Sequence, residues 1–182
     1  FKELTLTVNN SAWIDRSFWT INTSIVYANG QNYVTDGATG KAEHILDGDT
    51  GTFLSLVKPG KSYAAGGSTY VTPADHQLYF IIDMGVAQKF NYIQWAHRAG
   101  NSNNYLRVWG IGVYGSNDGT SFTAIKTGID IPYGSITPPQ ELPIPSSEYR
   151  YVKVTIEKWS DNSGGSKSGS TVQISEFNLG NK

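Results

Sequence analysis

The short stretch from Ala42 to Phe53 holds the residues whose types and spacing could do metal chemistry in this chain. Asp47, Asp49 and Thr52 bring three oxygen-bearing side chains together around a glycine in the sequence DGDTGT. Calcium takes about six to eight oxygen ligands from carboxylates, hydroxyls and main-chain carbonyls, and glycine lets the backbone turn tightly enough for such ligands to converge. The stretch therefore predicts a hard-cation site, although not an EF-hand, whose loop has a different spacing.

A carboxylate near the other end of the chain is expected to complete this site. Glu176 lies in the run ISEF, inside an apolar, strand-like segment, where an unpaired charge is costly to bury unless a cation or a donor meets it. Glu176 is therefore the predicted remote ligand. The alternative interpretation is that DGDTGT is only an Asx-rich turn, because Asp side chains in turns commonly accept hydrogen bonds from their own backbone.

Size and composition exclude several classes of protein. The chain has 182 residues and fits one domain over residues 1–182 with a single core. With 14 Lys plus Arg against 15 Asp plus Glu, its net charge of -1 favours neither nucleic-acid binding nor membrane binding. The absence of cysteine excludes disulfides, thiolate metal sites and a cysteine nucleophile. Because the chain begins at Phe1, we interpret it as a mature protein or an excised fragment.

The elements that must position these residues are predicted to be strands. The chain has 20 Gly and 23 aromatic residues (11 Tyr, 7 Phe and 5 Trp), and its period-two runs favour an all-β fold of antiparallel strands. An Asp-Gly turn at Asp118 predicts a hairpin, and the prolines from Pro138 to Pro145 indicate a connection or an edge segment. The expected strands are 78–84, 91–98, 108–114, 149–159 and 171–179.

No set of residues has a spacing that indicates catalysis. We find no activated nucleophile, no histidine cluster and no carboxylate pair beyond the acidic residues already assigned to a cation. Phosphate-binding glycine motifs are also absent. The lone histidines His44 and His97 are interpreted as structural, and Trp13, Trp19, Trp95 and Trp109 as buried. The sequence therefore favours a binding module over an enzyme.

The ordered segments of the chain resemble a known family. ILDGDTGT, FIIDMG, YIQWAHR, VYGSNDGTSF, YRYVKVTI and ISEF follow one another as in the discoidin family, which includes the coagulation factor V/VIII C-type domains and the bacterial family 32 carbohydrate-binding modules. The resemblance is strongest over residues 40–180. It implies a galactose-binding-like jelly-roll β-sandwich. The first forty residues are expected to supply an opening strand and a variable segment.

The resemblance also implies which residues would bind a structural calcium ion. The side chains of Asp47, Thr52 and Glu176 correspond to the family ligands, with Asp49 acting mainly through its carbonyl, and main-chain oxygens of His44 and Ser175 would complete the shell. Such an ion would stabilise the fold by mass action. One position departs from the family pattern, because Leu54 stands where a tryptophan is usual.

Three segments have the aromatic and polar groups that bind sugars. The first runs from His97 to Tyr105, where family 32 modules often use an arginine, here Arg98. The second is a long loop from Lys58 to His76, and the third lies at Trp159. In each segment the alternative is a structural role, such as an ion-paired arginine, locally packed tyrosines or a tryptophan that caps the core. The candidate ligand residues are Arg98, Asn101, Asn104, Tyr105, Tyr63, Tyr70, His76 and Trp159.

The leading hypothesis is a non-catalytic module that binds terminal galactose or N-acetylhexosamine residues of glycans. By resemblance, such modules are appended to secreted bacterial glycoside hydrolases (hexosaminidase or chitobiase, sialidase, galactosidase) or to surface lipoproteins. An extracellular, cell-surface or periplasmic location and a monomeric module within a larger chain would follow. The alternatives are a membrane- or protein-adhesion discoidin domain, which the missing cysteines and lack of basic charge disfavour, and a spacer without a ligand.

Overall fold

The protein is built from strands. The computed structural model describes residues 12–24, 26–28, 31–33, 41–65, 68–100, 105–132, 139–160 and 169–182. No helix within these ranges has both the length and the apolar character needed to cross a membrane. The elements are β1 (Thr20–Thr23), β2 (Val26–Ala28), β3 (Gln31–Tyr33), the 3-10 helix η1 (Ala42–Leu46), β4 (Leu54–Val57), β5 (Ser62–Ala65), β6 (Ser68–Val71), β7 (Tyr79–His97), β8 (Val108–Ser116), β9 (Thr123–Asp130), β10 (Gln140–Trp159) and β11 (Thr171–Gly180).

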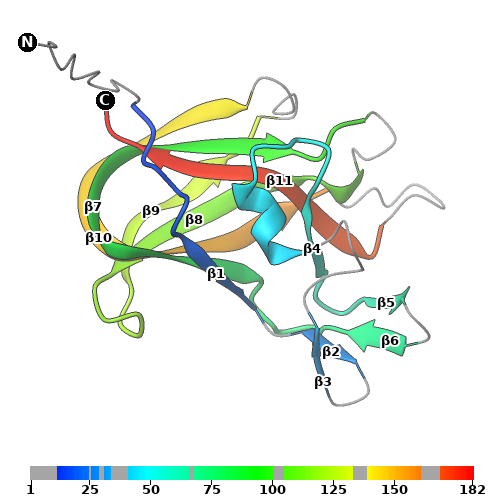
Figure 1. Cartoon of the computed structure of the whole chain (residues 1–182). Coiled ribbons are helices and arrows are strands. Elements are labelled where there is room, and N and C mark those ends of the chain that lie inside the picture. The colour runs from blue at the N-terminus through cyan, green and yellow to red at the C-terminus, as the bar shows by residue number, and fades with distance from the viewer. Residues whose placement is uncertain are drawn as a thin grey trace, which may run out of the picture.

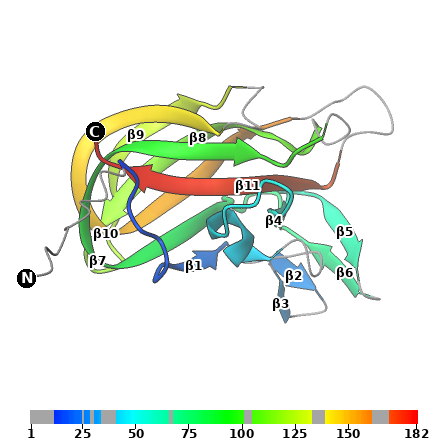
Figure 2. The same cartoon turned by 45° about the horizontal axis from the view of Figure 1, so that its top comes forward.

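Two long strands, β7 and β10, bend and pass through both layers of an antiparallel sandwich (Figures 1 and 2). The rings of Phe80 and Trp95 are only 6.4 Å apart between centroids, although both belong to β7. Fifteen residues of straight strand would separate them by about 50 Å. The strand therefore turns back across the core near Gly85, whose φ of 80° lies in the left-handed region that glycine tolerates.

Strand pairing defines the two layers. In one layer, the first half of β7 pairs with β1 and with the second half of β10, which is followed by β8 and β9. In the other layer, the second half of β7 lies between β11 and the first half of β10, and β4 pairs with β11. A separate small sheet has the order β3-β2-β6-β5. The predicted all-β antiparallel sandwich is confirmed.

The core lies between the inner faces of the layers. Val152, Val154 and Ile156 of β10 are fully buried, as their alternation predicted, and they belong to the same hydrophobic cluster as Phe80, Trp95 and Phe177. Leu54, at the position where the family has tryptophan, is also fully buried and pairs with Ile174. Leu54 therefore packs in the core.

Several predicted boundaries need correction. The runs 78–84 and 91–98 are parts of the single strand β7, because the bend preserves hydrogen bonding between them. The segment from Lys58 to His76 is not a plain loop, since it contains the hairpin β5–β6 that joins the small sheet. Trp109 is 44% exposed and so is not buried, because it lies on the outward side of β8.

Other sequence predictions are confirmed. The hairpin at Asp118 connects β8 to β9. Pro143 lies in the first half of β10, where β7 is the neighbouring strand in the described part of the sheet and the register shifts after the proline. This is the edge segment that the prolines indicated, because proline cannot donate a ladder hydrogen bond. Pro138 and most of the segment 160–170 lie outside the described residues.

Candidate functional site

The segments that follow β4, β7 and β10 gather at one end of the sandwich, which we call the loop end. The Lys58 ammonium, with its side chain almost fully buried, holds this end together. Its Nζ donates hydrogen bonds to the main-chain oxygens of Ser160, at 2.8 Å, and Tyr105, at 3.3 Å. Lys58 therefore ties three chain segments that are distant in sequence to a single point.

A pocket of about 420 Å³ opens at the loop end beside Trp159, and we call it the Trp159 pocket. It unites residues from two of the segments singled out in the sequence, His76 before β7 and Trp159 at the end of β10. The first turn of chain after β4 supplies Pro59. The pocket is lined by Pro59, Ala74, Asp75, His76, Gln77, Leu78, Ile156, Glu157 and Trp159.

The walls of the Trp159 pocket combine an aromatic ring with hydrogen-bonding groups. The Nε2 atom of His76 is buried and has no hydrogen-bond partner among the described residues, which leaves its bonding capacity open. The Glu157 carboxylate accepts the Gly128 N–H at 3.0 Å, and the Gln77 amide donates to the Ile156 carbonyl at 2.8 Å. An aromatic face beside polar groups suits a sugar ring, which has an apolar C–H side and hydroxyl edges.

Sequence reasoning missed three polar residues of this pocket: Asp75, Gln77 and Glu157. A signal for Glu157 was present, since it stands two residues before Trp159 and alternate residues share one face of a strand. Asp75 and Gln77 flank His76 in the chain, but nothing in their spacing set them apart from other exposed loop residues.

Arg98 lies at the same end of the sandwich but is not part of the pocket lining. Its guanidinium carbon is 3.9 Å from the ring centroid of Phe53, and its Nη1 donates to Gln173 Oε1 at 2.8 Å. The alternative expected for Arg98 was a carboxylate partner, and the partner found is an amide. A role of Arg98 in sugar binding stays a prediction.

The remaining candidate ligand residues are spread around the loop end. Tyr63 and Tyr70 are directly opposite each other in the β5–β6 hairpin, and both are half-buried. Tyr105 is half-buried, and its carbonyl accepts the Lys58 ammonium. Asn101 and Asn104 lie outside the described residues. Of the six candidates that the structure describes, only His76 and Trp159 line the Trp159 pocket.

His97, interpreted as structural, is fully buried behind the loop end. The Trp95 indole N–H donates to its Nδ1 at 3.4 Å, and its Nε2 lies 3.2 Å from the Pro132 carbonyl. Nε2 must then carry the proton and donate it. Burial lowers the pKa of His97 to about 4, with a smaller contribution from the nearby Arg107 charge, so the imidazole is neutral at pH 7.

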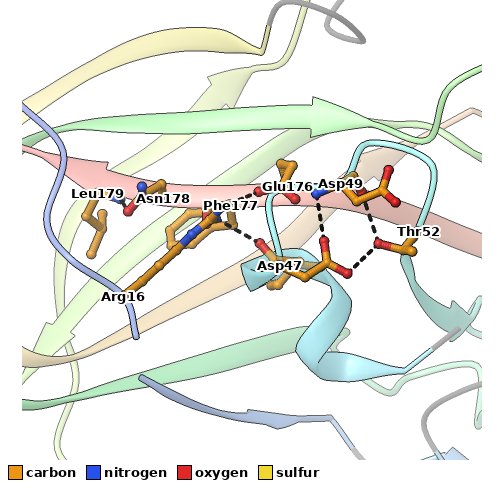
Figure 3. A network of polar contacts seen from close by, with 9 residues as sticks. Arg16, Asp47, Asp49, Thr52, Glu176, Phe177, Asn178 and Leu179 are labelled. Atoms are coloured by element: carbon orange, nitrogen blue, oxygen red, sulfur yellow. Dashed lines mark hydrogen bonds and ion pairs between the residues drawn. The ribbon is translucent and has the colours of Figure 1, made fainter. Parts of the chain in front are cut away.

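The acidic stretch forms a tight turn after η1 (Figure 3). Asp47 Oδ1 accepts the Asp49 N–H at 2.8 Å, and Asp47 Oδ2 lies 2.7 Å from the Thr52 hydroxyl. Asp49 turns its own carboxylate to the Gly51 N–H at 2.7 Å. The two aspartates therefore do form Asx turns, as the alternative interpretation held, and the carboxylate of Asp49 is directed to the backbone.

Glu176 of β11 lies beside this turn and meets a charge that the sequence did not indicate. Arg16, from the segment before β1, places Nη2 2.8 Å from Glu176 Oε2. Its Nη1 donates to the carbonyl of Phe177 at 2.8 Å. Burial raises the pKa of Glu176, Arg16 opposes the rise, and the nearby Asp47 carboxylate adds to it. The predicted proximity of Asp47 and Glu176 is confirmed.

The oxygen atoms around Asp47, Thr52 and Glu176 meet part of what a hard cation requires of its ligands. Glu176 Oε1 is buried and has no hydrogen-bond partner among the described residues, although Oε2 is paired with Arg16. Within the described ranges no three His, Asp or Glu side chains cluster as metal ligands. An ion here would rely on Asp47, Glu176 Oε1 and the Thr52 hydroxyl, with carbonyls such as those of His44, Asp49 and Ser175. These oxygens fit calcium chemistry.

Solved structures with the same fold are bacterial carbohydrate-binding modules and related domains. The C-terminal domain of a chitobiase from Bacteroides fragilis is 22% identical, with 92% of this chain and 95% of that chain covered and a TM-score of 0.62. The module CpGH89CBM32-5 from Clostridium perfringens, in complex with GalNAc-β-1,3-galactose, is 15% identical, with 88% and 94% covered and a TM-score of 0.61.

A third structure is the CBM32 of AlyQ in complex with 4,5-unsaturated mannuronic acid, which is 18% identical, with 87% and 95% covered and a TM-score of 0.52. No curated protein matches the chain. The family model of the F5/8 type C domain matches residues 26–170, which is most of the chain. The bent antiparallel sandwich and this match agree, and the chain belongs to the F5/8 type C domain family.

Proposed function

We propose that this domain is a non-catalytic module that binds terminal galactose or N-acetylhexosamine residues of glycans in the Trp159 pocket. The observation that carries the proposal is the pocket itself, where the ring of Trp159 stands in the same walls as the unsatisfied Nε2 of His76. Trp159 would stack on the C–H face of the sugar. His76, Asp75 and Gln77 would bond its hydroxyls.

Family membership and the GalNAc-β-1,3-galactose ligand of one structural neighbour support this substrate class, and the mannuronic acid derivative bound by another supports saccharide binding in general. With a volume of about 420 Å³ the pocket has room for only one or two sugar residues, so we expect dissociation constants from roughly tens of micromolar to millimolar. The parent protein would be a secreted bacterial glycoside hydrolase or a surface lipoprotein. The domain would then act outside the cytoplasm and bring that protein to its glycan.

A glycan array with the wild-type domain and the variant Trp159→Ala tests the proposal. Wild type should bind galactose- or N-acetylhexosamine-terminated glycans, and the variant should lose binding at least tenfold while its circular dichroism spectrum shows that it remains folded, although its melting temperature falls because Trp159 also packs against the core. Phe18→Ala is the matched control, because Phe18 is an exposed aromatic residue that lines none of the pockets described here. Equal binding by wild type and Trp159→Ala would refute the pocket. Binding to anionic vesicles without glycan binding would favour the adhesion class.

We also propose that calcium binds between Asp47 and Glu176 as a structural ion. The buried, unpartnered Oε1 of Glu176 and the adjacent Asp47 carboxylate support a cation at this point. The ion would stabilise the folded state by mass action, because the unfolded chain does not hold these oxygens together. Removal of calcium with a chelator should lower the melting temperature of wild type and have little effect on Glu176→Gln. A melting temperature that does not respond to chelator in wild type would rule out the ion.

A further inference from the structure

A second hollow lies on the outer face of the layer that contains β8 and the second half of β10, and we call it the outer groove. It has a volume of about 310 Å³ and is lined by Gln77, Tyr114, Phe122, Lys153 and Thr155. Lys153 of β10 pairs in register with Tyr114 of β8. Phe122 comes from the turn between β8 and β9. The outer groove therefore has aromatic walls, an amide, a hydroxyl and one ammonium group.

A glycine forms part of the sheet at this hollow. Gly112 of β8 pairs with Thr155, and a Cβ atom at this position would lie 2.7 Å from Thr155 Oγ1 and 3.0 Å from Tyr114 Cε2. The first contact is shorter than real Cβ atoms show and the second is tighter than most, so a larger residue would require the side chains of Thr155 and Tyr114 to shift. The groove depends on this glycine, which leaves room for neighbouring side chains to lie over the sheet.

Lys153 gives the outer groove a charge that is not neutralised by a nearby acid. Its Nζ lies 4.2 Å from the ring centroid of Tyr79 and 5.8 Å from that of Phe122. No carboxylate of the described residues lies within 4.0 Å of its Nζ. By contrast, Lys89 and Lys158 of the same sheet form ion pairs with Glu148 and Asp130. An ammonium group on aromatic faces retains the capacity to bind an anion.

The outer groove continues the Trp159 pocket. Gln77 lines both hollows, and its amide is held by hydrogen bonds to the carbonyls of Ile156 and Leu78. Along β10, Thr155 lines the groove and Glu157 lines the pocket. Two residues along a strand span about 6.7 Å, which is close to the length of one sugar ring. A glycan with one residue in the pocket could thus place its next residue in the groove.

The charges of the two hollows differ in sign. Asp75 and Glu157 give the Trp159 pocket two carboxylates, and no lysine or arginine of the described residues is part of its lining. Lys153 is the charged residue of the outer groove. The pocket therefore disfavours an anionic sugar, and the groove favours one.

We propose that the outer groove is a second subsite, which binds an acidic residue of the same glycan chain through its carboxylate or sulfate group. Lys153 would hold the anion, and Tyr114 and Phe122 would contact the ring. This inference rests on the proposed function, because it takes the Trp159 pocket as the site of the neutral residue.

NMR titration of the isotope-labelled domain tests the two sites separately. The Trp159 indole N–H reports on the pocket, and the backbone amides of Tyr114, Phe122 and Lys153 report on the groove. The probes are lactose and two related disaccharides in which the terminal galactose is unchanged and the second sugar carries either a carboxylate or a sulfate. Lactose should shift only the Trp159 indole. The acidic forms should shift both sets of signals and bind about tenfold tighter, and comparison of the two forms distinguishes carboxylate from sulfate.

The variant Lys153→Gln should abolish the tenfold gain and the groove shifts while leaving lactose binding unchanged. Lys126→Gln, which removes an exposed lysine outside the groove lining, is the matched control and should behave as wild type. Equal affinity for lactose and its acidic forms, or a gain that persists in Lys153→Gln, would overturn the second subsite. Sodium glucuronate alone gives an independent readout, and an absence of groove shifts with it would also overturn the inference. If neither lactose nor N-acetylgalactosamine nor N-acetylglucosamine moves the Trp159 indole, the proposed function fails instead.

Discussion

Individual residues at two positions carry buried charges that the fold must neutralise. Glu176 has a side chain only 4% exposed, and it combines a guanidinium partner at one oxygen with an unpartnered second oxygen. Lys58 is equally buried but is bonded to main-chain carbonyls. At both positions a charge is placed where it joins segments that are far apart in the chain. Removing either group therefore affects more than a local contact.

The variant Arg16→Ala should lower the free energy of unfolding by about 3 kcal/mol at pH 7, because it leaves the Glu176 carboxylate buried without its partner. The loss should shrink as the pH falls, since the pKa of Glu176 is raised and protonation removes the unpaired charge. Urea denaturation at neutral and acidic pH measures both effects. Arg16→Lys, which keeps the charge, should lose less.

The variant Arg16→Ala also tests the proposed calcium ion. If the proposed ion binds Glu176 Oε1, added calcium should restore part of the stability of Arg16→Ala. A loss that is unaffected by calcium would indicate that Arg16 alone neutralises the site. A variant as stable as wild type at both pH values would contradict the role of the ion pair.

His97 should make the domain less stable in mild acid. Its folded-state pKa of about 4 lies below the ordinary value of 6.5, so the unfolded state binds the proton first. Stability should therefore be complete above about pH 6.5 and fall as the pH drops towards 4, by about 2 kcal/mol between pH 7.5 and pH 5. Denaturation at the two pH values measures the slope.

The variant His97→Asn should remove this part of the pH dependence, and His44→Asn is a matched control that should retain it. Glu176 contributes with the opposite sign, because its pKa is raised. The difference between wild type and His97→Asn therefore isolates the imidazole. Identical slopes in these two proteins would contradict the assignment.

At the scale of elements, the loop end depends on how three strand ends are connected. Lys58 follows β4, Tyr105 precedes β8, and Ser160 follows β10 directly after Trp159. Pro59 and Trp159 both line the pocket and stand next to residues of this cluster. The distance across the pocket is thus set in part by the Lys58 hydrogen bonds.

We expect Lys58→Met to weaken glycan binding about tenfold, which corresponds to about 1.4 kcal/mol. The reason is that the chain segments of Pro59 and Trp159 would no longer be joined by the Lys58 hydrogen bonds. The unfolding free energy should fall by about 2 kcal/mol, since two buried carbonyls lose a charged donor. Calorimetric titration and thermal denaturation measure the two quantities. The exposed Lys61→Met in the same segment is the control, and equal binding by both variants would show that Lys58 does not shape the pocket.

At the scale of the whole molecule, the two proposed sites are built from different elements of the sandwich. The acidic turn and η1 pack beside β11 near Arg16 (Figures 1 and 3). The Trp159 pocket is formed at the loop end by β10 and the segment before β7. The segment at Trp13 pairs with Gly180, so the first and last described residues lie together. A small pocket such as the Trp159 pocket suits a module that acts with others.

Two copies of the domain joined by a flexible linker should bind a dense glycan surface at least a hundredfold more tightly than one copy, because the second contact is intramolecular. Surface plasmon resonance on a galactose-rich glycan layer measures the gain. A tandem with Trp159→Ala in one copy is the control and should bind like a single domain. A tandem no tighter than the single domain would contradict binding through one pocket per copy.

The sequence by itself determined the strand-rich fold and the outward and inward faces of β10, because side chains alternate along a strand whatever surrounds it. It also determined that the DGDTGT turn and Glu176 belong together, since a buried carboxylate needs a partner. It did not reveal Arg16 as that partner, because WIDRSFW has no periodic or motif signal that distinguishes an ion-pairing arginine from a solvated one.

Only the tertiary structure decided which sugar candidates share a site. His76 and Trp159 are 83 positions apart in the numbering and meet because β7 and β10 pair in antiparallel register, whereas Arg98 turns to Phe53 and Gln173. The continuation of the pocket into the outer groove also required coordinates. Local patterns report which face of an element a residue occupies, but contacts between elements depend on register and bending, which the whole chain sets through long-range packing.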